Sequence, residues 1–73
     1  MSENLEEILQ VLKAGLLVNP KDPYKRFKLG STLRKLGELQ KAVDELRRAV
    51  ELDPKKFNAH YELGLSLEDL ERH

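Results

Sequence analysis

The chain has 73 residues and no cysteine, so it is long enough for one small domain and has no disulfide framework to hold it together. Charged residues make up 36% of it and aromatic residues 5%, a composition that favours helices with solvated outer faces over a β-sandwich. The 13 basic and 13 acidic side chains balance, and the sequence pI of about 6.7 argues against a nucleic-acid-binding protein.

The N-terminal residues MSENLEE are acidic, and no basic segment followed by an apolar core is present, so we expect no signal peptide. No apolar run approaches the ~18 residues that a membrane span needs, and we expect no membrane partner. The lack of cysteine suits a reducing compartment. Together these features predict a cytoplasmic protein.

The balanced charge conceals an uneven distribution along the chain. Residues 1–22 carry two basic and four acidic side chains, residues 23–56 carry ten and five, and residues 57–73 carry one and four. A basic middle between acidic ends can attract acidic ligands or the ends of another copy. The simpler interpretation is a solvated helical surface with local ion pairs.

The first predicted helix begins after Ser2 or Asn4, either of which can cap a helix N-terminus. Asn4 and Glu7 have the spacing of a capping box. The helix is predicted to end near Val18, because the residue before Pro20 disfavours helical geometry. Its apolar residues recur at helical spacing, at Leu5, Ile8, Leu9, Leu12 and Leu16.

The second predicted helix runs from about Pro23 to Leu36. Asp22 is an N-cap residue, and Pro23 occupies the first helical position, where its missing N–H costs nothing. Gly37 fits the left-handed position just past a helix end. A third helix is predicted from about Leu39 to Leu52, and a fourth over 57–70 after Asp53-Pro54. The buried side of the third comprises Leu39, Ala42, Val43, Leu46, Ala49 and Val50.

Several residues recur at a constant spacing, which we call one repeat period. Leu29, Gly30, Leu33 and Leu36 return one period later as Leu63, Gly64, Leu67 and Leu70. A fixed period of about 34 residues indicates a repeat architecture, in which each unit buries its apolar face against its neighbours. Glycine in a helix interior costs about 1 kcal/mol relative to alanine. We therefore expect a neighbouring helix backbone to approach Gly30 and Gly64 closely.

This pattern resembles the tetratricopeptide repeat, a helix–turn–helix unit of about 34 residues. The matching positions are Leu29, Gly30, Gly37, Ala42, Ala49 and Pro54. Leu33 and Leu46 replace aromatic residues of the family pattern, and Arg26 and His60 stand where the family favours a bulky apolar residue.

The resemblance implies an all-α fold, a four-helix antiparallel helix-turn-helix stack that forms a short α-solenoid. It divides the single domain of residues 1–73 into a half repeat over 1–20, a full repeat over 23–56 and a half repeat over 57–73. The expected function is a non-enzymatic interaction module or scaffold that binds a protein or peptide partner.

In this family the first helix of each repeat lines a concave groove that binds peptides or helices. By resemblance, the groove residues of the full repeat are Tyr24, Phe27, Ser31, Arg34 and Lys35. Those of the following half repeat are Asn58, Tyr61, Leu65, Glu68 and Asp69. Arg34 and Lys35 would form a basic rim, and Glu68 and Asp69 an acidic one. Alternatively, the aromatic rings serve mainly to pack the helices together.

The end helices suggest a second role. Val11 and Leu17 widen the apolar stripe of the first helix, and the last helix has leucines with no following helix to cover them. Exposed apolar patches usually mark interfaces. The alternative function is therefore structural homo-oligomerisation through these ends, with the chain itself as the partner.

No set of residues suited to catalysis, metal binding or cofactor binding stands out. His60 and His73 are the only histidines, and no carboxylates are spaced to converge on either of them. Gly30-Ser31-Thr32 lacks the strand, the glycine spacing and the lysine of a phosphate-binding loop. We expect no enzymatic activity, no cofactor and no nucleic-acid partner.

Overall fold

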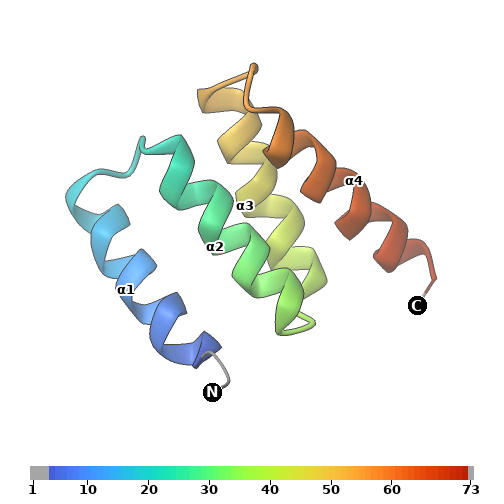
Figure 1. Ribbon diagram of the computed structural model, residues 1–73, viewed down its shortest axis with the longest axis horizontal. Helices are drawn as coiled ribbons and strands as arrows, with labels where there is room; N and C mark the ends of the chain where they lie inside the picture. The colour runs from blue at the N-terminus through green and yellow to red at the C-terminus, as the bar shows by residue number, and fades with distance from the viewer. Residues whose placement is uncertain (1–3, 73) are drawn as a thin grey trace.

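The computed structural model describes residues 4–72. It contains four α-helices and, within that range, no strand: α1 (Leu5–Val18), α2 (Pro23–Lys35), α3 (Leu39–Leu52) and α4 (Phe57–Glu71). Consecutive helices run antiparallel and are joined by short turns, with α2 and α4 starting at the same end of the molecule (Figure 1). The predicted all-α helix-turn-helix stack is confirmed. None of the four helices has the length and apolarity needed to cross a membrane.

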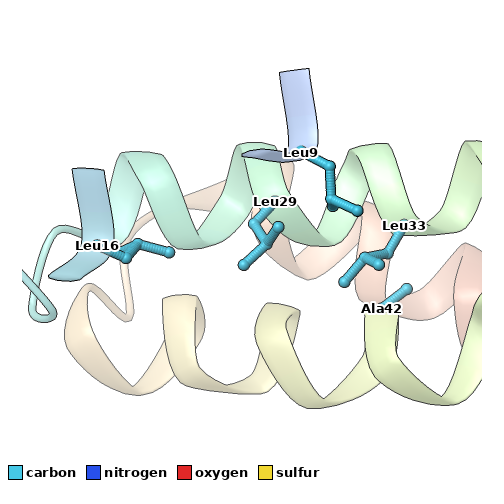
Figure 2. Packing of buried hydrophobic residues seen from close by; sticks show 5 residues of the cluster. All are labelled: Leu9, Leu16, Leu29, Leu33 and Ala42. Carbon is cyan, nitrogen blue, oxygen red and sulfur yellow. The ribbon is translucent and has the colours of Figure 1, made fainter. Parts of the chain in front are cut away.

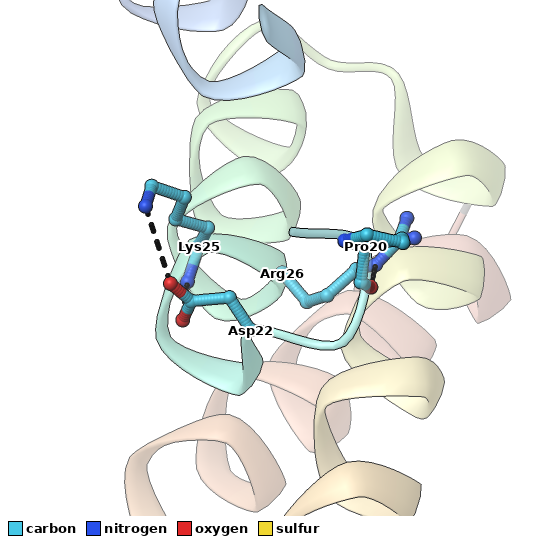
Figure 3. A network of polar contacts seen from close by, with 4 residues as sticks. All are labelled: Pro20, Asp22, Lys25 and Arg26. Atoms are coloured by element: carbon cyan, nitrogen blue, oxygen red, sulfur yellow. Dashed lines mark hydrogen bonds and ion pairs between the residues drawn. The ribbon is translucent and has the colours of Figure 1, made fainter. Parts of the chain in front are cut away.

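Side-chain caps start the first two helices. Asn4 Oδ1 accepts a hydrogen bond from the Glu7 backbone N–H at 3.2 Å, while Ser2 lies outside the described residues. Asp22 Oδ1 accepts from the Lys25 backbone N–H at 3.1 Å, and Lys25 Nζ lies 3.2 Å from Asp22 Oδ2 (Figure 3). The backbone hydrogen bond is the main reason why the pKa of the Asp22 carboxyl falls below its ordinary value.

A left-handed glycine ends the second helix. Gly37 has φ +83°, and the Glu38 backbone N–H donates to the Leu33 carbonyl at 2.9 Å, which is the hydrogen bond of a Schellman motif that spans more residues. The helix stops at Lys35, one residue earlier than predicted, with Leu36 as its C-cap. This tight turn lets α3 fold back along α2 at once.

The hydrophobic core lies where α1, α2 and α3 meet. Its cluster contains Leu9 and Leu16 from α1, Leu29 and Leu33 from α2, and Ala42 from α3 (Figure 2). Further along α3 the core continues through fully or almost fully buried residues, Val43, Leu46 and Ala49, and into Ala59 and Ser66 of α4. α3 thus packs against both α2 and α4, which fixes where α4 lies relative to α2.

The two mid-helix glycines have different environments. A Cβ at Gly30 would lie 2.6 Å from Leu46 Cγ and 3.3 Å from the Ala42 carbonyl oxygen, which confirms the predicted close approach. The same prediction for Gly64 is wrong: Gly64 is exposed, and no described atom comes within 4 Å of the Cβ position. Among residues 4–72, no side chain or backbone lies over Gly64 as Leu46 and Ala42 lie over Gly30.

Candidate binding surface

The ten predicted groove residues are distributed over two helices that contact each other. Five lie on α2 and five on α4, and we refer to the ten residues together as the α2–α4 face. The two helices reach this arrangement because each packs against α3, which lies between them in the chain (Figure 1).

The expected basic and acidic rims are joined rather than separated. Arg34 Nε lies 3.2 Å from Asp69 Oδ2, and Arg34 Nη1 lies 3.8 Å from Glu62 Oε1. The three side chains are partly buried, with between 18% and 38% of each exposed. Arg34 is therefore engaged within the chain and crosslinks α2 to α4. Lys35 and Glu68 are both exposed, and Glu68 pairs with Arg72 on its own helix at 2.9 Å.

The other end of the α2–α4 face is aromatic. Lys56 Nζ lies 5.3 Å from the ring centroid of Tyr24 and 5.3 Å from that of Phe27, so one ammonium group faces two rings. Such cation–π contacts contribute ~0.5–1 kcal/mol at exposed sites. Lys56 occupies the N-cap position of α4, and its contacts therefore tie the start of α4 to the start of α2.

Two aromatic side chains on this face are mostly exposed. Tyr24 is 57% and Tyr61 67% accessible, whereas Phe27 is half-buried. Phe27 therefore contributes partly to helix packing, and the tyrosines mainly to the surface. Asn58, three residues before Tyr61, is exposed as well. Ser31 and Leu65 are half-buried, and in sequence each lies between the aromatic and the charged residues of its helix.

Lys56 and Glu62 contact residues of this face, although neither is among the ten predicted residues. Glu62 and Asp69 are separated by about two helical turns, so their spacing already placed the two carboxylates on one side of α4. Lys56 lies just before the helix, where no periodicity indicates its direction. Only the tertiary structure brings it to Tyr24 and Phe27.

A cleft outside the predicted face lies between α1 and α3. It has a volume of about 300 Å³, and its floor contains Leu29 and Leu33 of α2. Its rim carries both charges, from Glu6, Glu38, Asp44, Glu45, Lys13, Lys41 and Arg48. This mixture favours neither an anionic nor a cationic ligand. Among residues 4–72, no three His, Asp or Glu side chains are grouped as a metal site would require.

The helices of this chain form antiparallel pairs joined by tight turns, and small residues allow them to stack closely where they cross. This arrangement defines an α-helical repeat protein. A family profile described as TPR repeat matches residues 30–70, more than half of the chain, and the chain belongs to the TPR repeat family. Comparisons with curated proteins and with solved structures gave no match. TPR repeats generally mediate protein–protein interaction, and the family is typically non-enzymatic.

Proposed function

We propose that this chain is a protein-binding module that docks a peptide or a helix on the α2–α4 face, the concave groove of its repeat stack. One observation carries the proposal. Three of the four aromatic residues of the chain, Tyr24, Phe27 and Tyr61, belong to this face, and all three lie within the first five residues of α2 or α4. Aromatic anchors of this kind supply most of the binding energy in protein interfaces.

The charges near these aromatic residues suggest the character of the ligand. Arg34 is paired with Asp69 and Glu62, whereas Lys35 and Lys56 form no ion pair with any described residue. Lys56 lies at the aromatic end and makes that end of the face positive, whereas Lys35 lies at the other end of α2. The aromatic end suits a segment with an apolar anchor next to an acidic side chain, because the carboxylate would meet Lys56 as the anchor contacts the tyrosines.

In this proposal the face belongs to one domain, residues 1–73. A full repeat over 23–56 supplies α2 and α3, and half repeats over 1–20 and 57–73 supply α1 and α4. The cysteine-free composition is consistent with the cytoplasm as the place of action.

Selection from a random peptide library, followed by titration of the selected peptides, tests this function. The Tyr24→Ala/Tyr61→Ala variant should weaken binding at least ~tenfold, since anchor residues at interfaces typically contribute more than about 1 kcal/mol each. Leu17→Ala is the matched control, because Leu17 is 87% exposed on α1 and lies outside the face. Selected peptides that bind the double variant as tightly as the parent chain would contradict the proposal, as would a selection that yields none.

A second candidate function is structural homo-oligomerisation through the end helices. Its support is the exposure of apolar residues on α1, where Val11 is 71%, Leu17 87% and Val18 88% accessible. Sedimentation velocity from micromolar to millimolar concentration tests it. Growth in mass with concentration is expected, and a monomer throughout would contradict this function while leaving peptide docking intact.

A further inference from the structure

Three residues on α4 are identical to three buried residues of α2, one repeat period earlier. Leu63, Gly64 and Leu67 correspond, one repeat period later, to Leu29, Gly30 and Leu33; we call the first three residues the open face of α4. Leu33 is 5% accessible and Leu67 37%, while Gly30 is buried and Gly64 exposed. All three positions are therefore covered on α2, whereas on α4 Leu63 is half-buried and Gly64 and Leu67 are exposed.

On α2, the residue Gly30 is covered by two residues of α3. Leu46 of α3 sits over Gly30, so close that an added Cβ would lie 2.6 Å from its Cγ. Ala42, one turn earlier on α3, brings its carbonyl oxygen to 3.3 Å of the same position. A helix that covers the open face in the same way must therefore present a leucine to Gly64.

α1 carries that leucine on a side that residues 4–72 cover only in part. Leu12 lies one repeat period before Leu46, and Ile8 lies one repeat period before Ala42. Leu46 and Ala42 are completely buried, whereas Leu12 and Ile8 are only half-buried. α1 contacts α2 chiefly through Leu9 and Leu16, and Leu12 also packs in part against this core. Ile8 and Leu12 remain half-buried and Val11 exposed, so these three residues form an apolar side of α1 that is only partly covered.

We propose that the open face of α4 docks α1 of a second copy of this chain, with Leu12 of that copy over Gly64 as Leu46 lies over Gly30. The inference rests on the second candidate function, self-association, and names its interface. The new contact continues the established α2–α3 packing into the next copy, so that α4 and the incoming α1 together form a helix pair. Because the two surfaces differ, the contact is head-to-tail, and each bound copy leaves one end free for another.

The charges of the two ends determine how this assembly responds to salt. Residues 1–22 carry two more acidic than basic side chains, and residues 57–73 carry three more. Like charges repel and salt screens the repulsion, so added salt should strengthen the head-to-tail contact. A contact based on attraction between the basic middle and an acidic end would weaken instead.

Two variants, each with one of the two contact surfaces blocked, test the interface. Gly64→Lys fills the position over which Leu12 would lie, and it replaces an exposed mid-helix glycine with a better helix former, so the monomer itself should gain stability. Ile8→Lys places a charge on the partly covered apolar side of α1. If Ile8→Lys lowers the helix content measured by circular dichroism, Val11→Lys at its exposed position replaces it.

Sedimentation velocity of each variant and of their equimolar mixture gives the result. Each variant alone should remain monomeric where the parent chain assembles, and the mixture should form a dimer and nothing larger, because only one compatible pair of surfaces remains. Assembly of Gly64→Lys alone, or of the α1 variant alone, would overturn the head-to-tail contact in favour of another interface. A parent chain that stays monomeric would instead remove self-association itself.

Discussion

Arg26 and His60 make the same contact one repeat period apart. Arg26 Nε donates to the carbonyl oxygen of Pro20 at 3.1 Å, and His60 Nε2 lies 2.9 Å from the carbonyl oxygen of Pro54 (Figure 3 shows Arg26 and Pro20). Both residues occupy the first turn of their helix, where the family favours a bulky apolar side chain. A polar contact to the turn that follows the preceding helix therefore takes the place of apolar packing at this position.

Arg26 makes a further contact that should matter more for stability. Its Nη1 lies 2.8 Å from Glu45 Oε1 on α3, with only 14% and 19% of the two side chains exposed. Arg26→Met should lower the free energy of unfolding by about 1–3 kcal/mol, because it leaves a largely buried carboxylate without its partner. Urea denaturation followed by circular dichroism measures the change.

The double variant Arg26→Met/Glu45→Met is the control for this pair. Since it removes both charges and fills the space with apolar groups, it should be more stable than Arg26→Met alone. Equal stability of the single and double variants would show that the pair is not coupled in solution.

Alanine at the two mid-helix glycines should have opposite effects. Gly30→Ala should destabilise the fold by about 1–3 kcal/mol, because the new methyl group meets the buried Leu46 and the Ala42 carbonyl. Gly64→Ala should stabilise it by about 1 kcal/mol, because the position is open and alanine is the better helix former. Thermal unfolding at low micromolar concentration compares the stability of the two variants with that of the parent chain. Stability changes of the same sign at both positions would contradict this difference in packing.

The hydroxyl group of Ser66 offers a stabilising substitution. Ser66 is fully buried, and its Oγ has no hydrogen-bond partner among residues 4–72. Ser66→Ala should raise the free energy of unfolding by about 1 kcal/mol, because an unsatisfied buried polar group costs ~1–3 kcal/mol. Thr32, one repeat period earlier, is the control, since its Oγ1 donates to the Lys28 carbonyl at 2.7 Å and Thr32→Val should destabilise. A loss of stability in Ser66→Ala would mean that the hydroxyl finds a partner in solution.

Asp22 should make stability depend on pH in the acidic range. The pKa of its carboxyl is lowered in the folded chain, chiefly by the hydrogen bond from the Lys25 backbone N–H. The stabilisation is therefore complete above the ordinary carboxyl pKa and is lost as the pH falls through the lowered value. Asp22→Asn keeps an N-cap acceptor without the charge. Its midpoint of thermal unfolding should fall less steeply with acid than that of the parent; equal slopes would show that Asp22 does not contribute.

Local features of the sequence were sufficient to predict where the helices lie. Asn4 and Asp22 cap helix starts, Gly37 takes the left-handed conformation that ends a helix, and Pro54 follows the end of α3. Each of these effects acts within one helical turn, on backbone groups close in sequence. Periodicity then identified the core positions, since α3 buries the residues that its spacing predicts, apart from the half-buried Val50.

The sequence by itself therefore determined the helices, their order and the family. Tertiary structure decided which charges meet and which repeat positions are covered. Arg34 pairs with Asp69 and Glu62 because α3 holds α2 and α4 at that separation, and spacing along either helix says nothing of the other. Gly30 and Gly64 occur in matching surroundings in the sequence, yet within residues 4–72 a helix lies over Gly30 and none lies over Gly64. Local propensities act through the nearest backbone bonds, whereas burial depends on which surfaces lie opposite one another in space.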